Sequence, residues 1–192
     1  MLVFNGFIWI VGIMMLAVAL LIAQSVYRKP VSWLLIASIF GIYMLNVIRY
    51  TFFPFPIHTQ LIELMRTTMN EKDLVRINLI PFYSQHYSSI FQDKSNYLNV
   101  LMTVPYGLLL PLLVPMNRQR MLFYALGIGV TIELLQGLFN LWFGYTYRTV
   151  DMNDIIFNFV GAMIGWELLR LFCRTTFGKK RLARWLPDVV KK

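Results

Sequence analysis

Residues 2–27 read LVFNGFIWIVGIMMLAVALLIAQSVY, an apolar run without a single charged side chain. About 20 consecutive apolar residues in a helix cross the roughly 30 Å hydrocarbon core of a bilayer, so this run is long enough to span a membrane. It lacks the basic residues that open a secretory signal peptide, and its end, Gln24-Ser25-Val26-Tyr27, is a poor cleavage site. The run therefore predicts a retained transmembrane helix.

Four further apolar runs follow along the chain. They lie at about residues 31–53, 98–115, 121–143 and 151–173. The composition agrees, because 58% of the 192 residues are hydrophobic and only 14% are charged, whereas soluble domains average about 25% charged residues. The sequence therefore predicts an all-α integral membrane protein with a five-helix transmembrane bundle. Pro105, Gly107 and Pro111 predict that the third helix is kinked or partly unwound.

The runs divide the chain into three parts. These are an extra N-terminal transmembrane helix (residues 1–30), a helical membrane domain (31–173) with a long outer loop (54–97), and a basic tail (174–192). The loop contains both histidines, His58 and His86, which we expect to be ordinary loop residues. Apolar residues at near-helical spacing over residues 61–69 predict a short amphipathic helix there. The single cysteine, Cys173, excludes an internal disulfide framework.

The basic residues predict the orientation in the membrane. Twelve Lys and Arg residues fall on one side of the predicted bundle and six on the other. Because cytoplasmic flanks carry the excess of Lys and Arg, we expect the tail to be cytoplasmic and the N-terminus and the long loop to be outside. The protein is then a multi-pass protein of the cell membrane. Its net charge of +9 reflects this orientation and contact with anionic lipid headgroups, and we expect no nucleic-acid partner.

Polar side chains inside the predicted spans gather at one depth. An ionisable residue at the centre of a membrane helix costs about 2.5–3.5 kcal/mol, so such residues usually face the interior of a bundle. Here they share one face of each helix, in the predicted outer half: Asn46 with Arg49, Asn99 with Thr103, Glu133 with Gln136 and Asn140, and Asp151 with Asp154 and Asn158. With Arg148 in the preceding loop, we expect these groups to line one site that is open to the outer leaflet.

These residue types suit a lipid headgroup that contains phosphate. Arg49 and Arg148 each offer a two-pronged guanidinium to phosphoryl oxygens. Asp151 and Asp154 suit a divalent cation such as Mg²⁺, which is often held by one or two carboxylates together with substrate oxygens. Glu133 lies deeper and is less hydrated, the usual environment of a general acid or base.

The same residues also fit purely structural roles. Asp154 with Arg148, or Glu133 with Arg49, would then form ion pairs that fix the bundle. Asp151 would only cap the fifth helix. Gly161 and Gly165 are more typical of a small-residue packing face than of a ligand contact.

The ordered set of motifs resembles the VanZ-like family of bacterial membrane proteins, named for a teicoplanin-resistance factor. The matching motifs are Arg49 followed by prolines, Asn78-x-x-Pro-Phe82, Asn99 leading to Pro105-Tyr-Gly107, Glu133-x-x-Gln136 and Arg148-x-x-Asp151-x-x-Asp154-x-x-x-Asn158-x-x-Gly161-x-x-x-Gly165. The resemblance covers about residues 46–165, and Tyr106 departs from the expected Phe. It implies a compact helical membrane domain, a link to lipoglycopeptide resistance, and action on phosphate-linked lipids.

Our first hypothesis is an outer-leaflet enzyme that hydrolyses or exchanges the headgroup of a phospholipid or a polyprenyl-phosphate lipid. The candidate catalytic residues are Glu133, Asp154, Arg148 and Asp151, the candidate substrate-binding residues are Arg49, Gln136, Asn158, Asn99 and Asn78, and the candidate metal ligands are Asp151 and Asp154. The second hypothesis is a non-catalytic binder of a lipid or a lipoglycopeptide that alters access to cell-wall precursors. The third, a small transporter, requires ionisable groups along the whole pathway, and the inner halves of the spans contain few.

Overall fold

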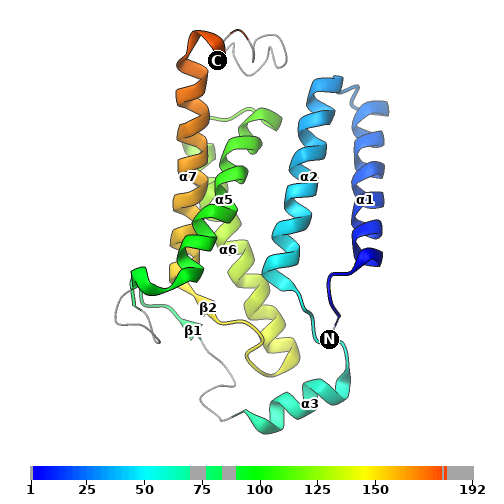
Figure 1. The fold of residues 1–192 in the computed structure, drawn as a ribbon, viewed down its shortest axis with the longest axis vertical. Helices are drawn as coiled ribbons and strands as arrows, with labels where there is room; N and C mark the ends of the chain where they lie inside the picture. The colour runs from blue at the N-terminus through cyan, green and yellow to red at the C-terminus, as the bar shows by residue number, and fades with distance from the viewer. Residues whose placement is uncertain (1, 70–76, 84–89, 179, 181–192) are drawn as a thin grey trace.

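The computed structural model describes residues 2–69, 77–83, 90–178 and 180. Within these residues, five helices are long and apolar enough to cross a membrane, which confirms the predicted all-α membrane bundle (Figure 1). They are α1 (Gly6–Ser25), α2 (Val31–Phe52), α5 (Lys94–Leu113), α6 (Arg118–Phe143) and α7 (Met152–Arg174).

Helix α5 differs from its prediction at its start and in its middle. It begins four residues earlier than the apolar run, because Asp93 caps it by accepting hydrogen bonds from the Ser95 backbone N–H at 2.9 Å and the Ser95 hydroxyl at 2.6 Å. The predicted partial unwinding is wrong, since the helix continues through Pro105 and Pro111. Packing between α2 and α7 holds it, and α2 contributes a hydrogen bond from the Tyr43 hydroxyl to the Met102 carbonyl at 2.6 Å.

Helices α5 and α7 form the most extensive helix–helix contact among the described residues, and glycines allow their backbones to approach closely. A Cβ atom added to Gly165 would lie 2.0 Å from the Val104 carbonyl oxygen, and one added to Gly107 would lie 1.9 Å from the carbonyl oxygen of Ala162. Gly161 meets α5 in the same way. The predicted packing role of Gly161 and Gly165 is therefore confirmed.

The apolar core fills only one half of this bundle. It consists of Tyr106 and Leu110 on α5, Met121 and Ala125 on α6, and Ala162 and Trp166 on α7. These residues come from the second half of α5, the first half of α6 and the middle of α7, so the core lies toward the turn between α5 and α6. The other half of the bundle is left for the polar side chains.

Helix α1 lies at the edge of the bundle beside α2 (Figure 1). None of its residues is buried, which suits a helix whose remaining surface faces lipid. The two helices meet at glycines, Gly12 against Leu45 and Gly41 against Leu16.

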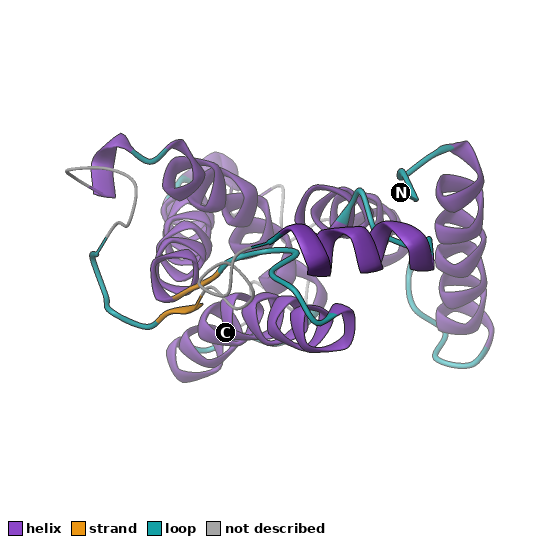
Figure 2. Cartoon of the chain, turned by 90° about the horizontal axis from the view of Figure 1, so that it is seen from below, coloured by secondary structure: helices purple, strands orange, loops and turns teal. Residues whose placement is uncertain are grey.

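The short helices and strands lie at the end of the bundle that is opposite the C-terminal end of α7 (Figure 1). Helix α3 (Thr59–Thr68) confirms the predicted amphipathic helix and crosses this end (Figure 2). Strand β1 (Ile77–Asn78) pairs in parallel with β2 (Val150–Asp151), a small sheet that the sequence did not predict, and the 3₁₀ turn η1 (Ile90–Gln92) precedes α5. His58 precedes α3, and His86 lies outside the described residues.

The N-terminus lies at the same end as α3, and the C-terminal end of α7 lies at the opposite end (Figure 1). This arrangement fits the predicted alternation of spans, while the predicted direction of the bundle in the membrane stays a prediction. Of the basic tail at residues 174–192, the structure describes only residues 174–178 and 180.

Candidate functional site: a polar cavity at one end of the bundle

A cavity of about 770 Å³ lies in the half of the bundle that the apolar core leaves free. Its lining comes from α2, α5, α6 and α7, from β1, and from the segment that leads into α7. Among the predicted site residues it is lined by Asn78, Asn99, Glu133, Gln136, Arg148, Asp151, Asp154 and Asn158. Four segments far apart in the sequence thus bring their polar side chains to one cavity.

Arg49 is the predicted site residue that does not line this cavity. It is exposed, and its guanidinium lies 5.5 Å from the centre of the Tyr50 ring. The cavity-lining face of α2 carries Asn46, Val47 and Tyr50. Because successive residues are roughly 100° apart around a helix, position 49 points away from that face. Its placement gives no support to the predicted role in binding phosphate.

The turn that carries Arg148 is folded by Asn140. Gly144 ends α6 with a positive φ of 68°, which favours glycine, and the chain then turns back over the helix end. The Asn140 side chain donates to the Arg148 carbonyl at 2.5 Å and accepts from the backbone N–H groups of Tyr147, at 2.8 Å, and Arg148, at 3.1 Å. Asn140, expected to face the site with Glu133 and Gln136, instead positions the segment that leads to it.

We expect Asn140→Ala to lower the thermal stability of the purified protein and to weaken ligand binding in the cavity. The change leaves two backbone N–H groups and one carbonyl of the turn without their partner, at a cost of about 1–3 kcal/mol for each buried group that stays unsatisfied. Thermal unfolding in detergent measures the first effect. Asn117→Ala is the matched control, because Asn117 caps the other end of α6 through one bond, from the Arg120 N–H. Equal losses in the two variants would contradict the positioning role of Asn140.

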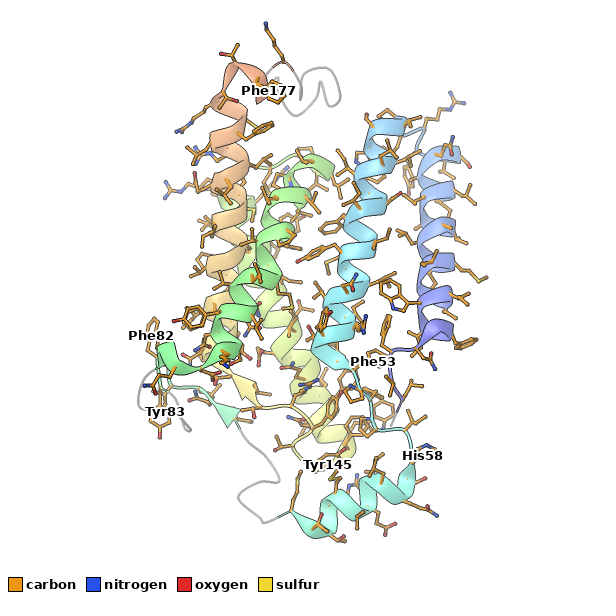
Figure 3. All side chains as sticks on the ribbon, viewed as in Figure 1. Phe53, His58, Phe82, Tyr83, Tyr145 and Phe177 are labelled. Atoms are coloured by element: carbon orange, nitrogen blue, oxygen red, sulfur yellow. The ribbon has the colours of Figure 1, made fainter. Side chains whose placement is uncertain are left out.

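The same turn is tied to the end of α2. The Tyr147 hydroxyl donates to the carbonyls of Phe52 and, at 2.7 Å, Pro54, and the Arg148 guanidinium donates to the Phe53 carbonyl at 3.0 Å. Burial raises the pKa of Tyr147 above its ordinary value, so its hydroxyl remains a donor at neutral pH. Figure 3 shows Phe53 where α2 ends. These bonds satisfy carbonyls that follow a helix end and fix the position of Arg148.

Asp151 and Glu133 are joined at the beginning of α7. The Asp151 N–H donates to Oε2 of Glu133 at 2.8 Å, while Oδ1 of Asp151 accepts from the Asn153 N–H at 2.8 Å. The second bond confirms that Asp151 caps α7. The pairing of β1 with β2 sets Asn78 opposite Asp151, and the Asn78 amide donates to the same Oδ1 at 3.0 Å.

Two asparagines hold the segment that follows β1. Asn78 donates to the Tyr83 carbonyl at 3.1 Å and accepts from the Ile80 N–H at 3.2 Å. Asn153 donates to the Tyr83 carbonyl at 2.7 Å and accepts from the Phe82 N–H at 2.7 Å. Figure 3 shows Phe82 and Tyr83 after β1. Asn153 was not predicted as a site residue. The available signal was an asparagine at the beginning of an apolar span, because polar residues in membrane spans usually face the interior of the bundle.

Asp93 was also missed as a site residue. It lines the cavity together with Ser95 and Asn96, because α5 begins earlier than its apolar run. The signal available in the sequence was Asp93 itself, because aspartate is one of the residue types that commonly cap the beginning of a helix.

The lining contains buried polar atoms without a partner among the described residues. They are Nδ2 of Asn99, Oε1 of Glu133, Oε1 of Gln136, Nε of Arg148, and both Nδ2 and Oδ1 of Asn158. Glu133 is only 3% exposed and Asn158 only 1%. A buried polar group left unsatisfied costs about 1–3 kcal/mol, so six such atoms around one cavity mark a place where a polar ligand or water completes their hydrogen bonds.

The charges of the lining are unequal. Among the described residues, four carboxyl groups, those of Asp93, Glu133, Asp151 and Asp154, face a single cation, Arg148. Neither of the two structural ion pairs that the sequence allowed, Asp154 with Arg148 or Glu133 with Arg49, is present in the described part of the chain. The ion pair found there joins Arg170 to Glu167 at 2.7 Å on the surface of α7.

A divalent cation would find few ligands here. The described part of the chain contains no group of three or more His, Cys, Asp or Glu residues placed to hold a metal ion. One oxygen of Asp151 is already engaged by Asn78 and Asn153. Mg²⁺ at Asp151 and Asp154 would therefore depend on the phosphate oxygens of the substrate and on water for the rest of its shell.

The fold and this cavity define a multi-pass helical membrane protein with a polar site between its helices. A family model described as VanZ/LLP1 matches residues 40–173, from the middle of α2 to the end of α7. The chain therefore belongs to the VanZ/LLP1 family, which is linked to glycopeptide resistance. Helix α1 lies outside the matched region. No curated protein and no solved structure matches the chain.

Proposed function

We propose that the cavity binds the phosphate-linked headgroup of a membrane lipid, either a phospholipid or a polyprenyl-phosphate lipid, and that the protein hydrolyses or exchanges that headgroup. The observation that carries this proposal is the set of six buried polar atoms, unpartnered among the described residues, that line the cavity from α5, α6, α7 and Arg148. The cavity volume of about 770 Å³ falls within the range of roughly 300–1,000 Å³ that is usual for small-ligand sites.

The mouth of the cavity supports a lipid as the ligand. Three of its lining residues are among the exposed large apolar residues of the chain: Tyr50 on α2 at 68%, and Leu98 and Leu101 on α5 at 62% and 69%. In a bundle whose outer surface faces lipid, an apolar rim between two transmembrane helices opens sideways into the bilayer. A lipid can then insert its headgroup while its acyl or prenyl chains stay in hydrocarbon.

The lining also supplies the chemistry for phosphoryl transfer. Arg148 donates one nitrogen to the Phe53 carbonyl, and its buried Nε is left to bind a phosphate oxygen. Glu133 is fixed through Oε2, and its second oxygen is available to accept or deliver a proton. Asp154, with Asp151, orients the attacking group or a bridging cation.

In hydrolysis, the oxygen of a water molecule forms a new bond to phosphorus while the bond between phosphorus and the leaving-group oxygen breaks. Glu133 takes one proton from the attacking water and returns it to the departing alkoxide, so the products are an alcohol and a phosphate monoester. In exchange, a second alcohol takes the place of water. Under the predicted orientation, the reaction occurs in the outer leaflet.

Incubation of the purified protein in lipid nanodiscs with headgroup-labelled phospholipids or polyprenyl-phosphate lipids tests this proposal. We expect release or exchange of the label, reduced about 100-fold or more by Arg148→Gln, because removal of one fixed donor to a transition-state oxygen costs about 10²–10³ in rate. Glu167→Gln is the matched control, since Glu167 is exposed and pairs with Arg170 far from the cavity.

The outcomes separate the hypotheses. If folded protein neither releases nor exchanges the labelled headgroup, the enzyme hypothesis is rejected. Binding of a lipid or a lipoglycopeptide without turnover favours the hypothesis of a non-catalytic binder. Loss of activity in EDTA with recovery on addition of Mg²⁺ supports a metal at Asp151 and Asp154, whereas full activity in EDTA rejects it.

A further inference from the structure

We infer that the headgroup bound in the cavity is zwitterionic and carries an ammonium group in addition to its phosphate. This inference rests on the proposed function, because it assumes that the ligand is a phosphate-linked lipid. Two independent features of the lining support it: the excess of carboxyl groups over cations, and the match between unpartnered donors and unpartnered acceptors.

The first feature is an excess of carboxyl groups over cations around one space. Glu133 is within electrostatic range of both Asp151 and Asp154, and Asp154 is within range of Asp93. Within the described part of the chain, Arg148 is the only cation in the lining. An anionic ligand alone would therefore meet four carboxyl groups and find one fixed cation to bind it.

Helix ends compensate only part of this charge. Asp93 caps α5 and Asp151 caps α7, and each helix N-terminus is equivalent to about half a positive charge. With Arg148 and both helix ends counted, an excess of about two negative charges remains if all four carboxyl groups are ionised. A buried charge without a partner is strongly unfavourable, so a ligand that brings a positive charge stabilises the ionised form of these carboxyl groups, whereas an anion alone does not.

The second feature is the hydrogen-bonding inventory of the unpartnered atoms. Three are acceptors, namely Oε1 of Glu133, Oε1 of Gln136 and Oδ1 of Asn158. Three are donors, namely Nε of Arg148, Nδ2 of Asn99 and Nδ2 of Asn158. An ammonium group has three N–H donors and no acceptor, and a phosphate has only acceptors at neutral pH. One headgroup with both groups, such as phosphoethanolamine, satisfies both sets.

The two alternative ligands fit less well. A glycerol headgroup, as in phosphatidylglycerol, adds the negative charge of its phosphate without a compensating cation. A divalent cation supplies positive charge, but no group of three or more potential metal-ligating residues is found in the part of the chain described. The ammonium is therefore the cation that the lining favours.

A binding comparison tests this inference without requiring turnover. The purified full-length protein in detergent with EDTA is titrated with phosphatidylethanolamine and phosphatidylglycerol of identical acyl chains, and with the corresponding diacylglycerol, by native mass spectrometry. We expect phosphatidylethanolamine to bind about tenfold more tightly than phosphatidylglycerol, because its ammonium group forms charge-assisted hydrogen bonds with carboxyl groups that a glycerol headgroup cannot form.

Variants identify the groups responsible. Glu133→Gln and Asp154→Asn each replace a carboxyl group by an amide with little change of shape, and we expect both to reduce this preference severalfold because an amide cannot pair as an anion with the ammonium. Glu167→Gln, on the outer face of α7, is expected to retain it. A melting curve for each variant verifies that it is folded, and two variants in different helices keep the test valid if one of them is unstable.

The outcomes distinguish this inference from the proposed function. Equal or tighter binding of phosphatidylglycerol overturns the ammonium but leaves a phosphate-linked ligand in place. Binding of both phospholipids no tighter than diacylglycerol rejects the proposed function as well. A preference for phosphatidylethanolamine that appears only with added Mg²⁺, or that survives in both carboxyl variants, also overturns the inference.

Discussion

Glu133→Gln is expected to reduce headgroup turnover by about 10²–10⁴-fold while leaving the protein folded, because that is the usual contribution of a general acid or base. Glutamine retains an oxygen that accepts the Asp151 N–H, so the link between α6 and the beginning of α7 survives. What is lost is an ionisable oxygen in the cavity. The measurement is the rate of label release in nanodiscs, with the melting temperature of the variant recorded in parallel.

Glu63→Gln is a suitable control for this variant, since Glu63 lies on the exposed amphipathic helix α3 and does not line the cavity. Turnover within tenfold of the wild-type rate in a folded Glu133→Gln protein would remove Glu133 from the proposed chemistry. The same rate loss in Glu63→Gln would show that the assay reports on something other than the cavity.

Gly165→Ala is expected to destabilise the bundle strongly, because α5 leaves no room for an added methyl group at this position of α7. The new Cβ would lie 2.0 Å from the Val104 carbonyl oxygen and 3.0 Å from the Leu108 nitrogen, both backbone atoms that cannot move without shifting α5. Overpacking of this kind typically costs about 1–3 kcal/mol and occasionally more. Because α5 and α7 also carry residues of the cavity lining, ligand binding should fall with stability.

Gly127→Ala provides the matched control, because a Cβ at Gly127 on α6 meets nothing within 4 Å. Alanine has the higher helix propensity, so this variant should melt at or above the wild-type temperature. The measurement is thermal unfolding in the same detergent. Equal melting temperatures for Gly165→Ala and Gly127→Ala would contradict the close packing of α5 against α7.

The sequence predicted the helical features well because their signals are local. Hydropathy over about 20 residues identifies a membrane span. Spacing of three or four residues identifies side chains on the same helix face, such as Glu133 with Gln136 and Asp154 with Asn158. The packing of Gly161 and Gly165 and the cap at Asp151 followed from the same short patterns.

The features that were missed depend on contacts between distant segments. The pairing of residues 77–78 with residues 150–151 joins two dipeptides with no distinctive pattern, and only the fold brings them together. Arg49 shows the limit of spacing arguments, because it is three residues from Asn46 and yet points away from the lining face of α2. Asn140 shared the correct face with Glu133, but it is used to fold the Arg148 turn.

The central claim is that polar groups are tolerated in these spans because they line a shared, water-accessible cavity. The single cysteine, Cys173, makes a direct test possible, since Cys173→Ser gives a background without thiols. Gln136→Cys places a thiol in the lining, and Leu138→Cys places one two residues away on the exposed, lipid-facing side of the same helix. A thiol reacts as the thiolate, which forms in water and not in hydrocarbon.

The decisive measurement is the rate at which a membrane-impermeant thiol reagent, added outside intact cells, labels these two variants. We predict that Gln136→Cys is labelled readily and Leu138→Cys is not. Labelling of Gln136→Cys that is no faster than that of Leu138→Cys would contradict a wet cavity that opens to the outer face.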